Sequence, residues 1–224
     1  ENGTVHALEQ DPEDSDLLFA GTEFGIFFSN NGGEKWVQLK SGIPTIAVRD
    51  IALQEREKDL LLATFGRGFY ILDNYSPLKT IDERFIDQEA HIFDIPEARI
   101  YIQKRGRYGQ GSTYYTGENP PYGAVFTYYL KETPKTLKQQ RKEKEKKLSK
   151  ENKPIPYPSW DELRAEDNEE KHFLLFTIFD NEGNVVRKMT TSPRSGINRI
   201  TWDFGYSDPS PIRLQGNEFN PLST

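Results

Sequence analysis

The chain contains an internal repeat, and this repeat limits its fold more than any other feature of the sequence. Shifting the sequence by 43 residues aligns residues 5–31 with residues 48–74 without a gap. Each copy predicts three short strands separated by polar or glycine-containing turns, and the first copy adds a fourth strand at 35–39. Repeats of about 40–50 residues with several strands each are typical of β-propeller blades. Seven aligned positions are identical: Val5/Val48, Asp16/Asp59, Leu17/Leu60, Leu18/Leu61, Ala20/Ala63, Gly25/Gly68 and Asn31/Asn74.

The repeat predicts that residues 1–76 form about two blades of a β-propeller. Two unrelated hairpin pairs that align by chance are the alternative. A propeller closes its ring with about four to eight blades, and each sheet buries a face against its neighbour. We therefore expect the chain to be a piece of a longer protein, with the remainder of the same propeller as a partner.

The rest of the chain follows a different pattern. Residues 77–105 are expected to be a connector, and residues 106–224 an immunoglobulin-like (Ig-like) β-sandwich that begins with a loop rich in Gly, Tyr and Pro. The predicted fold class is all-β: a partial β-propeller plus this sandwich, which carries a charged helical insertion. The β-branched and aromatic content predicts sandwich strands at 123–130, 173–180, 185–189 and 197–204.

The insertion covers residues 131–171. Its first half, 135–153, carries nine Lys or Arg and three Glu, whereas 161–170 carries six acidic residues and one Arg. Ser159 followed by Glu162 matches a capping box at the start of a second helix. Two exposed helices of opposite charge explain this pattern. A nucleic-acid or lipid patch at 141–147 is the alternative, and it lacks interleaved aromatic residues.

Composition excludes several classes of function. The chain has no cysteine, which rules out zinc fingers, disulfide scaffolds and thiol nucleophiles. Its formal net charge of -6 argues against nucleic acid as a partner, and no apolar run approaches the ~20 residues of a membrane span. His6, His91 and His172 lack metal-ligand spacing and no phosphate-binding loop is present, so we expect neither metal nor cofactor. The acidic run 11–16 is expected to be a solvated turn.

The turn after the third strand of the first copy matches the Asp-box pattern, Ser-x-Asp-x-Gly-x-x-Trp. Ser29, Asn31, Gly33 and Trp36 occupy its defining positions, with Asn31 in the place of aspartate. The expected role is structural. Asn31 hydrogen-bonds the backbone of its own turn, Gly33 adopts a positive φ, and Trp36 covers the hairpin.

The repeat, the Asp-box and the stretch 65–73 (Phe-Gly-Arg-Gly-Phe-Tyr-Ile-Leu-Asp) resemble the last blades of secreted bacterial Asp-box propellers. These BNR-repeat, or glycosyl-hydrolase-like, proteins are related in fold to sialidases, xyloglucanases and the sortilin receptors. The stretches 178–187 and 196–203 resemble the Ig-like modules that follow such propellers. The resemblance implies a secreted or periplasmic location and makes residues 1–76 the last blades of the ring.

Strand parity places a candidate ligand site. In an antiparallel meander, the start of the first strand and the turn between the second and third strands lie at the same end. Propeller ligands gather at this end, around the central channel. Strand-end ion pairs are the alternative role for the residues found there. These candidate ligand contacts are His6, Glu23, Arg49, Asp50 and Arg67.

The resemblance favours a parent protein that is glycosidase-like and acts on or binds glycans, with this chain accessory rather than catalytic. A glycosidase acid at Asp50 or Glu23 would need a second carboxylate roughly 5–10 Å away, so no catalytic residue is assigned. A non-enzymatic, sortilin-like propeller that binds proteins or peptides is the alternative, and a structural scaffold is a third. The aromatic candidates for stacking on sugar rings are Tyr108, Tyr114, Tyr115 and Tyr122.

Overall fold

The chain is rich in β-strands in the computed structural model, which describes residues 3–102, 111, 117 and 119–206. Contacts divide it into two compact units, Glu1–Lys135 with Arg194–Thr201, and Thr136–Pro193 with Trp202–Thr224. The expected predominance of β-structure is thus confirmed. The propeller and Ig-like assignments stay predictions.

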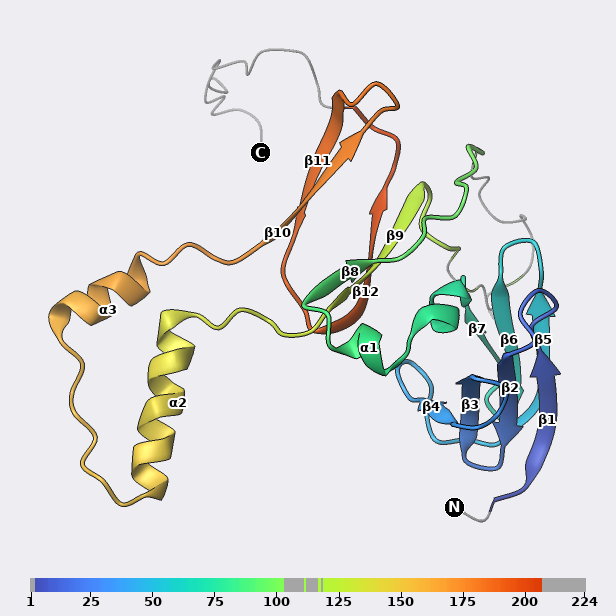
Figure 1. Cartoon of the computed structure of the whole chain (residues 1–224), viewed down its shortest axis with the longest axis horizontal. Helices are drawn as coiled ribbons and strands as arrows, with labels where there is room; N and C mark the ends of the chain where they lie inside the picture. Colours follow the sequence, from blue (N-terminus) through green and yellow to red (C-terminus); the bar gives the residue numbers. More distant parts are fainter. Residues whose placement is uncertain (1–2, 103–110, 112–116, 118, 207–224) are drawn as a thin grey trace. The chain divides into compact units, whose positions relative to one another are not determined.

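Each repeat copy forms an antiparallel sheet in which strands that follow one another in sequence lie side by side (Figure 1). The six strands predicted by the repeat are confirmed, as is the fourth strand of the first copy. The first sheet comprises β1 (Val5–Gln10), β2 (Leu17–Thr22), β3 (Gly25–Asn30) and β4 (Val37–Leu39). The second sheet comprises β5 (Val48–Gln54), β6 (Asp59–Thr64) and β7 (Phe69–Leu72).

The two sheets have the same strand register and the same irregularity. Val5 pairs with Thr22 in the first sheet, and Val48 pairs with Thr64 in the second. In both sheets the register shifts immediately after this pair, as at a β-bulge, and the extra residue is His6 in β1 or Arg49 in β5. The repeat therefore preserves a local backbone distortion as well as the strands.

The ungapped alignment is nevertheless wrong by one residue in the second strand of each copy. Leu18 pairs with Ser29, whereas Leu60 pairs with Leu72. Ser29 and Leu72 are 43 positions apart, so the equivalent of Leu60 is Leu18 and not Leu17. The turn before β6 is one residue shorter than the turn before β2, and the turn after β6 is one residue longer, which restores the alignment.

This register defines two equivalent faces on the sheets. On the first sheet, the front face carries Ala7, Phe19, Ile26 and Phe28, and the back face carries Val5, Leu8, Ala20 and Phe27. At the equivalent positions of the second sheet, the front face carries Asp50, Leu61, Phe69 and Ile71, and the back face carries Val48, Ile51, Leu62 and Tyr70.

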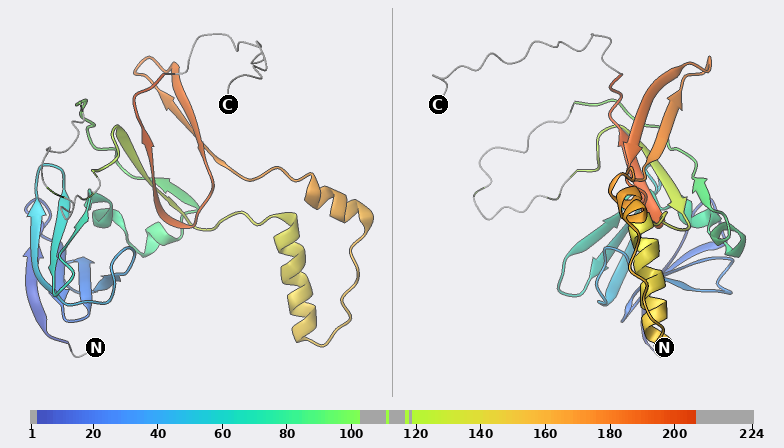
Figure 2. Two further views of the ribbon diagram at one scale, coloured as in Figure 1. Left: turned by 180° about the vertical axis from the view of Figure 1, so that it is seen from behind. Right: turned by 90° about the vertical axis from the view of Figure 1, so that its left-hand side faces the viewer.

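The sheets pack head to tail, with the front face of the first sheet on the back face of the second. One core cluster contains Phe19, Ile26 and Phe28 from the first sheet together with Val48 and Ile51 from the second sheet. The right-hand view of Figure 2 shows the blue strands β1–β4 and the teal strands β5–β7 as two layers. Unlike faces therefore meet, as in a stack whose members are related by one repeated operation.

A glycine allows the close approach of the two layers. A Cβ atom at Gly21 would lie 2.9 Å from Val48 Cγ1 and 3.0 Å from the Val48 carbonyl oxygen. Since a backbone atom is one of these neighbours, a larger side chain could not be accommodated by a rotamer change alone. Gly21 is thus a packing requirement of the interface.

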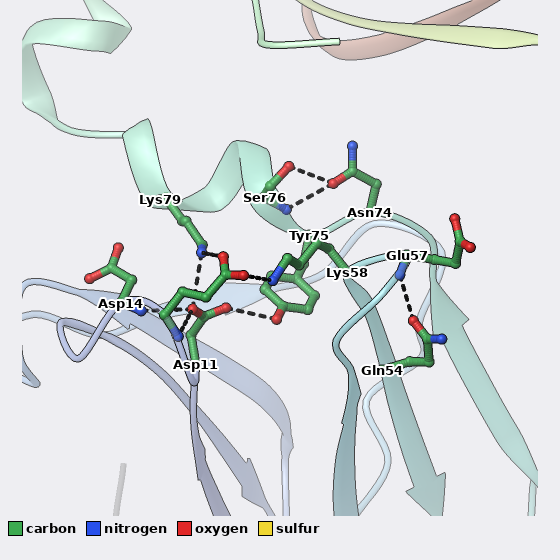
Figure 3. Close-up of polar contacts among 10 residues, drawn as sticks. Asp11, Asp14, Gln54, Glu57, Lys58, Asn74, Tyr75, Ser76 and Lys79 are labelled. Atoms are coloured by element: carbon green, nitrogen blue, oxygen red, sulfur yellow. Dashed lines mark hydrogen bonds and ion pairs between the residues drawn. The ribbon is translucent and has the colours of Figure 1, made fainter. Parts of the chain in front are cut away.

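A buried polar cluster ties the β1–β2 turn to the segment after β7 (Figure 3). Asp11 is only 2% exposed. Its carboxylate accepts hydrogen bonds from the Tyr75 hydroxyl at 2.7 Å and from Lys79 Nζ at 3.0 Å. The backbone N–H groups of Glu13 and Asp14 also donate to it, at 2.9 and 2.8 Å. The expectation of a solvated turn is wrong at Asp11, because a partner 64 residues away covers it.

The electrostatics of the cluster follow from this geometry. Burial raises the pKa of Asp11, but the hydrogen bonds from Tyr75, Lys79 and the two backbone N–H groups outweigh burial and leave the pKa below its ordinary value. Burial and the bond to Asp11 both raise the pKa of Tyr75. Asp11 is therefore an ionised, fully bonded carboxylate inside the first unit.

The rest of the first unit has regular structure within the expected connector, 77–105, and it includes the strands predicted at 123–130 and 197–204. It comprises a 3-10 helix η1 (Ser76–Thr80), a short helix α1 (Glu83–Ile86), and the strands β8 (Ala90–Ile92), β9 (Ala124–Leu130) and β12 (Gly196–Trp202). The three strands form a sheet in the order β12-β9-β8. β8 escaped prediction because its three residues include only one β-branched side chain, Ile92.

The second unit contains the predicted helical insertion and a β-hairpin. The helices are α2 (Leu137–Lys150) and α3 (Trp160–Asp167), and the hairpin strands are β10 (Leu174–Phe179) and β11 (Val185–Thr191). The capping box at Ser159 and Glu162 is confirmed. Opposite charges do join the helices, since Arg141 on α2 donates two hydrogen bonds to Glu166 on α3, at 2.5 and 2.9 Å.

Candidate functional site

The two bulge residues of the repeat touch each other. Arg49 Nη1 lies 3.4 Å from His6 Nδ1, although the two residues are 43 positions apart in the sequence. A guanidinium has only donors, so Nδ1 is the acceptor in this contact. Nε2 is closed off from solvent and has no hydrogen-bond partner among the described residues. Head-to-tail stacking has brought equivalent positions of neighbouring sheets side by side.

An aromatic ring completes this candidate site. The Arg49 guanidinium carbon lies 5.3 Å from the ring centroid of Phe65, within the range of a cation–π interaction. The Phe65 N–H donates to the carbonyl of Ala47, as the Glu23 N–H does to Thr4, so Phe65 holds the place of Glu23 in the second sheet. Sequence reasoning missed Phe65 because the ungapped alignment pairs it with Thr22.

The other predicted contacts lie at the same end of the sheets but not in this pair. Glu23 and Arg67 are exposed in the β2–β3 and β6–β7 turns, and Asp50 is exposed on β5. In the described part of the chain, no hydrogen bond or ion pair joins these three side chains to His6 or Arg49. The site that the structure assembles is therefore cationic and aromatic: an exposed guanidinium held by an imidazole and a phenyl ring.

The Asp-box turn has the hydrogen bonds that its pattern predicts. Asn31 Oδ1 accepts from Ser29 Oγ at 2.8 Å and from the Lys35 N–H at 2.9 Å. Ser29 Oγ in turn accepts from the Gly33 N–H at 2.9 Å. Gly33 has φ of 92°, and the Trp36 ring lies beside it. The motif thus locks the turn between β3 and β4, and it contributes no group to the His6–Arg49 contact.

Replacing Asn31 with alanine should destabilise the first sheet by about 1 kcal/mol, because Ser29 and Lys35 lose a shared acceptor at a partly exposed turn. Urea denaturation of the whole chain measures the change. Asn181→Ala, in the exposed turn between β10 and β11, is the matched control and should change stability by less than about 0.5 kcal/mol. An equal effect of the two substitutions would contradict the role of the motif.

Two further sets of expectations concern other parts of the chain. Tyr108, Tyr114 and Tyr115 lie outside the described residues, and Tyr122 forms an edge-to-face contact with Tyr101 at 5.3 Å between centroids. Among the described residues, no group of three or more His, Asp or Glu side chains could hold a metal ion. No helix in the described part combines the length and apolar character needed to cross a bilayer.

Comparison with known proteins gives no family: no protein-family model, no curated protein and no solved structure matches this chain. The function proposed below therefore rests on the site and on the stacking of the two sheets.

Proposed function

We propose that residues 1–76 are two neighbouring blades of an Asp-box β-propeller, and that this propeller belongs to a secreted, glycosidase-like protein. The observation that supports this most is the head-to-tail packing of two sheets with the same register and the same bulge. Residues 106–224 would then include the Ig-like module. On this proposal, the chain supplies one wall of a ligand site and is accessory rather than catalytic.

We propose further that the ligand is a glycan with acidic groups. Arg49 is exposed, and its contacts with His6 and Phe65 orient the guanidinium while leaving N–H groups available. A guanidinium binds carboxylates through two parallel hydrogen bonds, and charge-assisted bonds of this kind are stronger than neutral ones. Phe65 is 68% exposed and presents an apolar ring next to the cation, which suits the apolar face of a sugar.

An oligogalacturonate and its methyl ester, in which the carboxylate charge is removed, test this ligand class. Calorimetric titration of the full chain should show binding of the acid form and weaker binding of the ester. Arg49→Gln should weaken binding of the acid form by about 10-fold or more, since one charge-assisted contact contributes about 1.5–3 kcal/mol. Arg56→Gln, in the exposed β5–β6 turn at the other end of the sheet, is the matched control and should change affinity less than twofold.

Three results would contradict this ligand class. Equal affinity for the acid and the ester would show that the carboxylate charge of the ligand does not contribute to binding. Equal loss in Arg49→Gln and Arg56→Gln would show only nonspecific attraction, which also disappears at high salt. Tighter binding of peptides with a free carboxyl terminus than of any oligosaccharide would favour the peptide-binding, sortilin-like alternative.

A further inference from the structure

The back face of the first sheet is an open apolar groove. Its volume is about 570 Å³, and its lining includes Val5, Leu8, Ala20, Phe24, Phe27 and Trp36. Val5 is 58% exposed and Leu8 is 61% exposed in the described structure. Contiguous apolar surface of this kind on a folded sheet marks a contact site for another element.

The second sheet shows what this face packs against. Val48, Ile51 and Leu62 hold the positions equivalent to Val5, Leu8 and Ala20, and they are 0%, 4% and 2% exposed. They are covered by the front face of the first sheet. The same back-face positions are thus buried in the second copy of the repeat and exposed in the first copy. In the second copy, the surface that covers them is the front face of the first sheet.

We propose that the back face of β1–β4 is the docking site of a third antiparallel sheet, which presents a front face like that of the first sheet. Such a face carries large apolar side chains at the positions of Phe19, Ile26 and Phe28. It also needs a very small residue at the position of Gly21, opposite Val5, because Gly21 permits the equivalent approach to Val48. This inference rests on the proposed function, in that the two sheets are neighbouring blades, and it does not depend on which ligand binds.

A second copy of this chain fits the groove less well. The front face that another copy has open is that of its second sheet, and Asp50 stands there at the position of Ala7. Ala7 packs against the core in the observed interface. Docking the second sheet on Val5 and Leu8 would bury the Asp50 carboxylate against apolar side chains, which is costly without a partner.

A tandem chain tests the proposal directly. Residues 3–47 are added immediately before Val5 of the sequence, so that the new join between Ala47 and Val5 reproduces the natural join between Ala47 and Val48. The chain has no cysteine, so Leu8→Cys in the original copy supplies a single reporter thiol. Its reaction with a maleimide should be at least about tenfold slower in the tandem chain than in the original chain, because docking removes it from solvent.

Two controls make the result specific. Ser149→Cys on α2, which is exposed, should react at the same rate in both chains. Phe19→Asp with Phe28→Asp, confined to the added copy, removes its apolar front face and should restore rapid labelling of the L8C thiol.

Several outcomes would overturn the proposal. The proposal would be wrong if protease digested the added copy and the L8C thiol stayed reactive. Docking of the front face of the added copy should fold that copy and protect it from protease. A thiol that is already protected in the original chain, with a dimer mass by sedimentation, would show that a second copy covers the face. Glycan binding is not measured in this experiment, so its failure and that of the proposed ligand class are distinguishable.

Discussion

Substituting alanine for Asp11 is expected to lower the free energy of unfolding of the first unit by about 3–5 kcal/mol, the usual cost of removing one partner of a buried ion pair. The substitution leaves the Tyr75 hydroxyl without its acceptor and Lys79 without its closest carboxylate. Hydrogen exchange of the β2 amides in the whole chain measures the free energy of opening. Asp94→Ala, at an exposed position, is the matched control and should change it by less than about 0.5 kcal/mol.

The same carboxylate sets a pH dependence that checks the assignment. Because the pKa of Asp11 is lower in the folded chain than in the unfolded chain, its contribution is present above the ordinary value near 3.8 and is lost as pH falls through the folded value. The difference in stability between the unsubstituted chain and Asp11→Ala should therefore shrink between pH 5 and about pH 2. A difference that is constant over this range, measured by urea denaturation, would refute an ionised Asp11.

A second large effect on stability is expected because equivalent positions of the two sheets differ in solvent exposure. Phe28 and Ile71 occupy the same place on the front faces of the two sheets, yet Phe28 is 4% exposed and Ile71 is 59% exposed. Phe28→Ala should cost about 3–5 kcal/mol, because it leaves a cavity in the core between the sheets. Ile71→Ala should cost less than about 1 kcal/mol, since its side chain is largely solvated already.

Hydrogen exchange of β3 and β7 amides distinguishes the two substitutions in the intact chain. Head-to-tail packing predicts this asymmetry, whereas packing of like faces would bury both residues or neither. Similar costs for Phe28→Ala and Ile71→Ala would therefore contradict the arrangement of the two sheets.

The strands of the repeat could be predicted because their signal is local. Alternating apolar residues and glycine-containing turns gave the existence and order of β1–β7. The register of the second strand could not be predicted in the same way. Leu17 and Leu60 are identical in type and both are buried, but they lie on opposite faces of their sheets, and only the ladder partners Ser29 and Leu72 reveal this.

The buried polar cluster around Asp11 could not be predicted from the sequence for a related reason. An acidic run such as 11–16 predicts a solvated turn when it is considered by itself. Burial of Asp11 depends on Tyr75 and Lys79, which lie beyond the whole second sheet. No pattern near Asp11 carries that information.

Some residues of the candidate site could likewise be predicted from the sequence, and others could not. Strand parity placed both His6 and Arg49 at the same end of the sheets, and the structure brings them into contact. Phe65 was missed, because the shorter turn before β6 shifts it by one position to the place that Glu23 holds in the first sheet. The ends of strands were thus predictable, whereas the side chains that meet there depend on turn lengths.

The bond between Asp11 and Tyr75 has a consequence for how this region reaches its native state. It joins residues 64 positions apart, and Asn30 Nδ2 similarly donates to the carbonyls of Leu78 and Ile81. Neither sheet can gain these bonds until both are formed, so the pair should fold and unfold as one cooperative unit. Contacts of such long sequence separation also slow folding.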